Sequence, residues 1–198
     1  MKFLIGSLFT IQKYCEDVEY MKYKIKIMSE EEAVHFYENY KSENKYLLIS
    51  ISDKEGDLNF IPRENIEVHQ WYFADIEEDI VIPGIAPMSY RQAEEIKTVV
   101  CKAVHENITN IIIHCYAGIS RSGAVGCVIA KFLNGDDMYL WKQGRIAPNR
   151  WVYKLMCSAF DIEYSDKDFR CRQKISEQIV NMRLREYGIN ISNMFPQI

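Results

Sequence analysis

The chain has 198 residues, of which 48% are hydrophobic and 26% charged, and its formal net charge at pH 7 is −4. This length favours one domain, and the hydrophobic fraction is sufficient for a packed core. The acidic balance and the lack of a Lys/Arg block argue against a nucleic-acid partner, and no apolar stretch approaches the ~20 residues of a membrane span. Six cysteines without a Cys-x-x-Cys pair or metal-ligand spacing indicate free thiols in a reducing compartment, so we expect a cytoplasmic protein without a metal or cofactor.

The chain divides into an extension, a domain and a tail. We predict an N-terminal extension over residues 1–20, a single domain over 21–190 and a C-terminal tail over 191–198. The apolar run that begins at Phe3 is similar to a signal peptide, but it is short and no small-residue cleavage site follows it. We therefore do not expect export, and the sequence leaves the role of the extension open.

Predicted strands and helices alternate along the chain. Runs of branched apolar residues predict four strands, over residues 23–28, 46–51, 66–73 and 110–114. The first strand alternates lysine with apolar residues and is expected at a sheet edge. Helical spacing of apolar residues predicts six helices, over 29–40, 89–105, 122–134, 136–143, 149–160 and 168–187. This alternation indicates an α/β fold with a mostly parallel central sheet flanked by helices.

Local signals refine this assignment. Ser29 and Ser89 are each followed three residues later by Glu or Gln, the capping-box pattern of a helix start. The helix over 122–134 is expected to bury one apolar face, formed by Ala124, Val125, Val128, Ile129 and Phe132. The polar helix over 168–187 is expected on the surface. Three further thiols are expected to pack in the core, namely Cys101, Cys127 and Cys157.

The segment from Asn110 to Gly123 carries the chemistry. An apolar strand leads into Cys115, and a tight loop then connects it to Arg121 and a helix. Amide N–H groups of such a loop and of the first helical turn form a site for an anion, and they stabilise a thiolate over a thiol. The guanidinium of Arg121 would hold two oxygens of a tetrahedral oxyanion. Of the six cysteines, only Cys115 has an Arg six residues later, so the pattern predicts attack by a thiolate on a phosphoryl group.

Residues 114–122 match the His-Cys-x5-Arg-Ser/Thr signature throughout, and the chain thereby resembles the cysteine-dependent protein-tyrosine phosphatase superfamily. The small dual-specificity-like branch, with its compact bacterial and viral members, is the most similar. Arg145, Pro148 and Asn149 resemble a further conserved segment of these enzymes. The resemblance implies hydrolysis of phosphotyrosine in a phosphorylated protein, through a phosphocysteine intermediate. Whether phosphoserine and phosphothreonine are also substrates is left open.

The resemblance also implies a role for each residue of the motif. Cys115 is the nucleophile, Ser122 eases departure of its sulfur, and His114 supports the loop from the strand below. Arg121 binds the phosphate through its side chain. The backbone of the loop binds the same group, through Tyr116, Ala117, Gly118, Ile119, Ser120 and Arg121. Asn149 either orients the hydrolytic water or caps a helix, and we favour the cap.

A general acid must protonate the leaving oxygen. Family members place an Asp for this purpose on a separate loop upstream of the Cys, and Asp75 lies 40 residues before Cys115. The segment that begins at Phe73 resembles a Phe-x-Asp-Ile segment of compact bacterial relatives. Asp79, 36 residues before Cys115, is the alternative. We favour Asp75 as the acid.

Other functions remain open at this point. A non-catalytic module that only binds phosphate would keep Arg121 and the amide cradle. A phosphatase of non-protein phosphate esters is a second alternative. Residues 116–120 contain no lysine, whereas inositol-lipid phosphatases of this superfamily often carry basic residues there, so a phosphoprotein is favoured. The sequence does not determine the oligomeric state.

Overall fold

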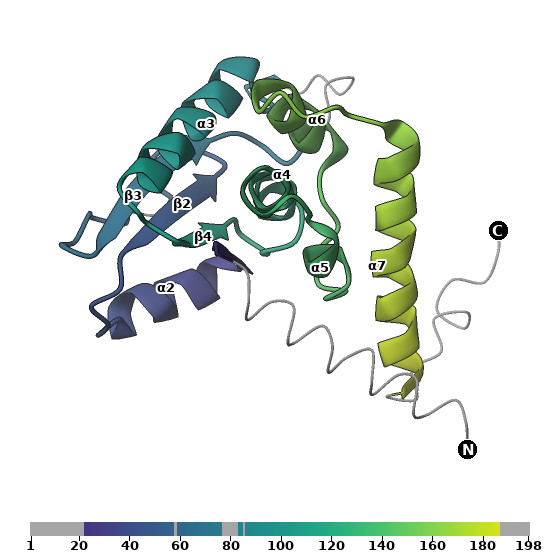
Figure 1. Cartoon of the computed structure of the whole chain (residues 1–198), viewed down its shortest axis with the longest axis horizontal. Helices are drawn as coiled ribbons and strands as arrows, with labels where there is room; N and C mark the ends of the chain where they lie inside the picture. Colours follow the sequence, from purple (N-terminus) through teal and green to yellow (C-terminus); the bar gives the residue numbers. More distant parts are fainter. Residues whose placement is uncertain (1–21, 58, 77–82, 85, 187–198) are drawn as a thin grey trace.

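Four parallel strands form the centre of the molecule. The computed structural model describes residues 22–57, 59–76, 83–84 and 86–186. The strands of this part are β1 (Lys24–Met28), β2 (Tyr46–Ser52), β3 (Ile66–Tyr72) and β4 (Asn110–His114). Their order across the sheet is β1-β4-β2-β3, and every pair is parallel (Figure 1). The predicted α/β fold with a parallel sheet is confirmed, and β1 lies at an edge as expected.

Both faces of the sheet are covered, which explains why the inner strands β2 and β4 carry consecutive apolar residues without alternation. Leu47, Ile49 and Ile51 of β2 belong to the larger hydrophobic cluster on one face. Leu48 lies between them in sequence and packs into the smaller cluster on the opposite face. Successive side chains of a strand point to opposite faces, so a strand buried on both sides is apolar at consecutive positions.

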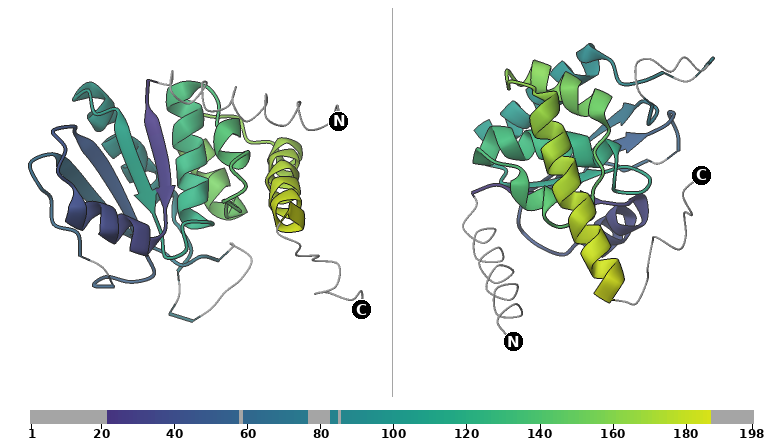
Figure 2. Two further views of the ribbon diagram at one scale, coloured as in Figure 1. Left: turned by 90° about the horizontal axis from the view of Figure 1, so that it is seen from below. Right: turned by 90° about the vertical axis from the view of Figure 1, so that its right-hand side faces the viewer.

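The helices form two layers around this sheet (Figure 2). Helix α2 packs against β1 and β4 on the face of the smaller cluster, whereas α3, α4 and α6 cover the other face. The helices are α2 (Glu30–Asn39), α3 (Tyr90–His105), α4 (Arg121–Asn134), α5 (Met138–Trp141), α6 (Arg150–Ala159) and α7 (Asp166–Glu186). Both predicted capping boxes are present, at Ser29 with Glu32 and at Ser89 with Gln92. None of the helices in the described ranges is long and apolar enough to cross a membrane.

Helix α4 is buried on all sides, which corrects the expectation of one apolar face. Every residue from Arg121 to Ala130 is buried, because α4 lies between the sheet and α6. Phe132, expected in the core, is 39% exposed and packs edge-on against Phe160 near the end of the helix. Gly135 ends α4 in the left-handed conformation, as its sequence predicts.

Three further expectations were wrong in detail. The helix expected over 136–143 is only the single turn of α5, and Asp137, which precedes it, is fully buried and accepts a hydrogen bond from Trp141 Nε1 at 2.9 Å. Helix α7 begins two residues earlier than predicted, and it buries Phe169 and Ser176 rather than lying wholly on the surface. Cys101 is exposed on α3, whereas Cys127 and Cys157 are buried as expected. The extension over 1–20, the tail over 191–198 and the predicted end of the last helix lie outside the described residues.

Candidate active site

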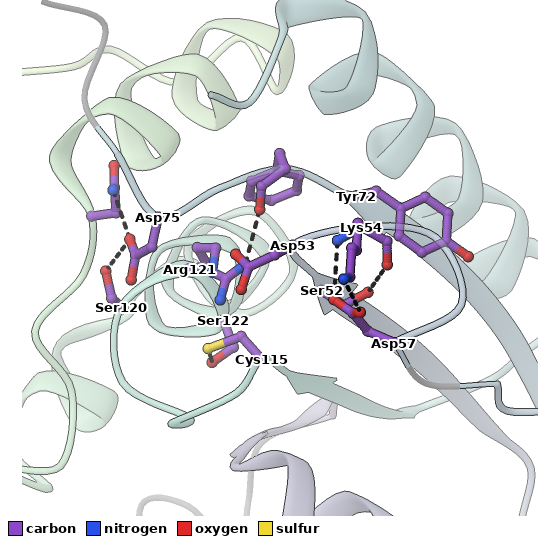
Figure 3. A network of polar contacts seen from close by, with 12 residues as sticks. Ser52, Asp53, Lys54, Asp57, Tyr72, Asp75, Cys115, Ser120, Arg121 and Ser122 are labelled. Atoms are coloured by element: carbon purple, nitrogen blue, oxygen red, sulfur yellow. Dashed lines mark hydrogen bonds and ion pairs between the residues drawn. The ribbon is translucent and has the colours of Figure 1, made fainter. Parts of the chain in front are cut away.

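The parallel sheet brings the candidate residues together at the carboxyl ends of its strands. Cys115 follows β4, Asp53 follows β2 and Asp75 follows β3, so all three lie where the carboxyl ends of parallel strands meet. Open α/β sheets bind ligands at this edge. Cys115 is 2% exposed, and its Sγ lies 3.1 Å from Ser122 Oγ in the first turn of α4. Figure 3 shows these side chains together with Arg121 and Asp53.

The loop after Cys115 presents backbone donors without acceptors. The N–H groups from Tyr116 to Ser122 form no hydrogen bond with any described residue. The carbonyls of the loop are instead bound from outside: Tyr116 O accepts from Glu30 N at 3.1 Å, and Ile119 O accepts from Ala147 N at 3.2 Å. The loop carbonyls are thus tied outward while its amides remain unpaired. Such a group of unpaired amides at a helix N-terminus is a site for an anion.

Gly118 is required by the shape of this loop. Its φ is +69°, and an added Cβ would lie 2.4 Å from Ser29 N and 2.5 Å from Met28 C. Both atoms belong to the backbone at the end of β1, which is paired with β4 and cannot move independently. A residue with a side chain is therefore excluded at this position on two grounds, backbone conformation and space.

Arg121 is held in place by two acceptors that come from different strands. The side chain is 5% exposed, and its Nη1 donates to Asp53 Oδ1 and to Phe73 O, both at 2.8 Å. Its Nε is buried and has no acceptor among the described residues. A buried guanidinium nitrogen without a partner is costly, so the site is built to receive a further acceptor beside Cys115.

Asp53 binds Arg121, although no sequence pattern singled it out. It follows β2 directly, and it is the carboxylate that pairs with the guanidinium. The signal that could have identified it is its position, directly after a buried strand at the edge where Cys115 also lies. Phe73 contributes only its carbonyl, and no sequence pattern reports on that atom.

His114 is the last residue of β4, directly before Cys115, and its ring contacts a neighbouring strand. Its Nε2 lies 2.8 Å from Ser50 Oγ on the neighbouring strand, and its ring packs edge-on against Phe60. Burial, reinforced by the positive charge of Arg121, lowers the pKa of His114 from 6.5 to about 4. The imidazole is therefore neutral near pH 7.

Asp75 is bound by two side chains, one from the loop and one from the start of α6. Ser120 Oγ donates to Asp75 Oδ1 at 2.7 Å, and Asn149 Nδ2 donates to the same oxygen at 2.8 Å. Asn149 also caps α6, since its Oδ1 accepts from Val152 N at 3.0 Å. The cap favoured from the sequence is present, and the same amide also reaches the carboxylate of Asp75. The alternative acid, Asp79, lies outside the described residues.

Two grooves adjoin the loop, and both are acidic. One, of about 670 Å³, is lined by Asp53, Lys54, Asp57, Tyr72, Asp75 and neighbouring residues. The other, of about 870 Å³, is lined by Tyr116 and by α2, including Glu30, Glu31, Glu32 and Glu38. Lys54 is the sole lysine or arginine among the described residues that line either groove.

No protein-family model and no curated protein sequence matches this chain. Among solved structures, it is similar to human DUSP28, with 13% identity over 80% of this chain and 94% of that one and a TM-score of 0.34. It is also similar to Tk-PTP in its active form, with 17% identity over 78% and 91% of the two chains and a TM-score of 0.36. Identities and scores this low leave the function to be inferred from the side chains of the site itself.

Proposed function

We propose that this protein is a cysteine-dependent phosphatase that hydrolyses phosphotyrosine in phosphorylated proteins. The observation that carries the proposal is the set of unpaired donors around Cys115, formed by the amides of residues 116–122 and the buried Nε of Arg121. A phosphoryl group above the sulfur would provide acceptors for all of them. These donors would then oppose the charge that develops on the phosphoryl oxygens during transfer.

The chemistry would proceed in two steps. Cys115 Sγ attacks phosphorus, the bond to the leaving oxygen breaks, and Asp75 gives that oxygen its proton, which yields a phosphocysteine and a free hydroxyl group. Water then attacks phosphorus and passes a proton to the Asp75 carboxylate, so that phosphate leaves and the thiolate is restored. Ser122, 3.1 Å from the sulfur, would stabilise the departing thiolate by donating its hydroxyl hydrogen.

The charge around the loop favours a phosphoprotein over a polyanion. Three aspartates line one adjoining groove and four glutamates line the other, whereas the described lining of both contains one lysine. A ligand with several phosphates, such as an inositol polyphosphate or the end of an RNA, would be repelled there. A single phosphorylated side chain on a protein avoids this cost, because only its phosphate enters the amide cradle.

The test is turnover of p-nitrophenyl phosphate by the intact chain and by Cys115→Ser. We expect kcat of the variant to fall on the order of 10⁴-fold, because the nucleophile is removed. Cys101→Ser, which changes an exposed thiol on α3, is the matched control and should retain wild-type kcat. Retained turnover in Cys115→Ser would disprove the assignment of Cys115 as the nucleophile.

The same assay separates the enzyme from a module that only binds phosphate. Vanadate should inhibit turnover of the wild-type chain, because its oxygens would occupy the amide cradle. A chain that binds vanadate but does not turn over p-nitrophenyl phosphate or a phosphotyrosine peptide would instead be a binding module, and the proposed catalysis would be wrong.

A further inference from the structure

Two side chains bind a single oxygen of Asp75. Ser120 Oγ donates to Oδ1 at 2.7 Å (Figure 3). Asn149 Nδ2 donates to the same oxygen at 2.8 Å. A carboxylate oxygen has two lone pairs in its plane, so two donors saturate Oδ1. The second oxygen, Oδ2, receives neither of these hydrogens. The two oxygens of the carboxyl group therefore have different hydrogen-bond surroundings.

Both donors are themselves fixed by the fold. Asn149 is 8% exposed, and its Oδ1 accepts from Val152 N, so the orientation of the amide is set and Nδ2 must face Asp75. Its backbone N donates to Ser120 O at 3.2 Å, which ties the start of α6 to the loop. Ser120 precedes the first residue of α4, but its hydroxyl does not cap that helix and binds Asp75 instead.

We propose that Ser120 and Asn149 are positioning residues that determine which oxygen of Asp75 transfers the proton. With Oδ1 occupied by two donors, the transferable proton is carried by Oδ2. As the P–O bond breaks, Oδ2 gives that proton to the leaving oxygen, and in the second step it takes one from water. This inference rests on the proposed function, because it assigns these residues to the acid of the same reaction.

The arrangement also joins the acid to the nucleophile. Ser120 lies in the loop that begins at Cys115, so a correctly formed loop brings its own anchor to Asp75. Asn149 adds an anchor from the start of α6, outside the loop. Loss of either donor would let the carboxyl group rotate, and a small misplacement of a proton donor is costly for the rate.

The experiment compares Ser120→Ala and Asn149→Ser with wild type on two substrates. Asn149→Ser keeps an oxygen that can cap α6 but is too short to reach Asp75. We expect each variant to lower kcat/KM for phenyl phosphate roughly 10-fold, and kcat/KM for p-nitrophenyl phosphate much less, because kcat/KM reports the first step and the better leaving group depends less on the acid. Inhibition by vanadate should stay within about 2-fold of wild type, since the loop amides are intact. Ser120→Thr, which keeps the hydroxyl group, should restore most of the kcat/KM on phenyl phosphate.

A double-variant cycle separates positioning from general damage. In an Asp75→Asn background, Ser120→Ala should cause no further loss on phenyl phosphate, because the acid that it positions is already absent. An equal loss in both backgrounds, or an equal loss on both substrates, would overturn the inference and leave Ser120 a structural role only. A wild-type chain without turnover would disprove the proposed function itself, which is a different result from an active wild type in which Ser120→Ala has no effect.

Discussion

His114 is a buried imidazole that remains neutral where most histidines begin to titrate. It is fully buried beneath the loop, and burial lowers its pKa from 6.5 to about 4. The unfolded chain takes up a proton near pH 6.5, whereas the folded chain does so only near pH 4. Between these values the unfolded state binds more protons, so the free energy of unfolding decreases as the pH falls and becomes constant again below about 4.

The measurement that checks this is urea unfolding of wild type and His114→Gln at pH 7 and pH 5. We expect wild type to lose about 2 kcal/mol of stability over this interval through His114 alone. The variant lacks this contribution, so its own loss should be smaller by that amount, and the other histidines cancel in the comparison. Parallel behaviour of the two proteins would mean that the folded chain protonates His114 as readily as the unfolded chain does.

The residues of the site differ in how far their positions could be predicted from the sequence. Cys115, Arg121 and Ser122 are placed by a contiguous motif, because spacing within one loop fixes how their atoms meet. The bond between Arg121 and Asp53 joins residues 68 positions apart in the chain. Such a contact depends on strand order in the sheet, which the residues of either segment do not encode by themselves.

At the scale of elements, α7 is attached to the body by a buried ion pair. Asp137 is fully buried and accepts hydrogen bonds from Trp141 Nε1 and from the hydroxyl of Tyr153, while Arg172 of α7 donates to its other oxygen. Burial raises the pKa of Asp137, and the charge of Arg172 opposes that effect. The carboxylate is therefore stable in the interior because α7 brings it a cation.

Removal of that cation should be strongly destabilising. We expect Arg172→Met to lower the free energy of unfolding by about 3 kcal/mol, because Asp137 would remain buried without its partner. The double variant Arg172→Met with Asp137→Asn should recover part of this loss, since the uncompensated charge is gone. Arg170→Met, an exposed position on the same helix, is the control for a change of net charge. Urea unfolding at pH 7 measures all four proteins, and equal stability of the two arginine variants would contradict this account.

The elements themselves were predicted where the signal is local. Capping boxes at Ser29 and Ser89 gave the starts of two helices, because all the groups involved lie within four residues. The full burial of α4 could not be read from its own periodicity, since it follows from the sheet and α6 on either side. The packing of α7 against the rest of the domain could not be predicted from its polar composition either. It depends on Arg172, which pairs with Asp137, a carboxylate 35 positions away in the chain.

For the molecule as a whole, the parallel sheet concentrates negative charge at the edge that carries the site. Three of the four strand ends there are followed by acidic residues: Glu30 and Glu31 after β1, Asp53 after β2 and Asp75 after β3. A charged surface of this kind raises the local concentration of ligands of opposite sign. A substrate with basic residues beside its phosphotyrosine would therefore encounter this edge more often than one with acidic residues.

This predicts a dependence of activity on the charge of the substrate. We expect kcat/KM for a phosphotyrosine peptide flanked by arginines to exceed that for its glutamate-flanked counterpart roughly 10-fold at low ionic strength, through attraction to the grooves. The ratio should approach one at about 0.5 M salt, because exposed charges are then screened over a few ångströms. Glu31→Gln combined with Glu38→Gln should reduce the ratio, since both line the groove beside Tyr116, whereas Glu177→Gln on α7 should not. A ratio that is insensitive to salt and to the groove variants would show that flanking charge does not select the substrate.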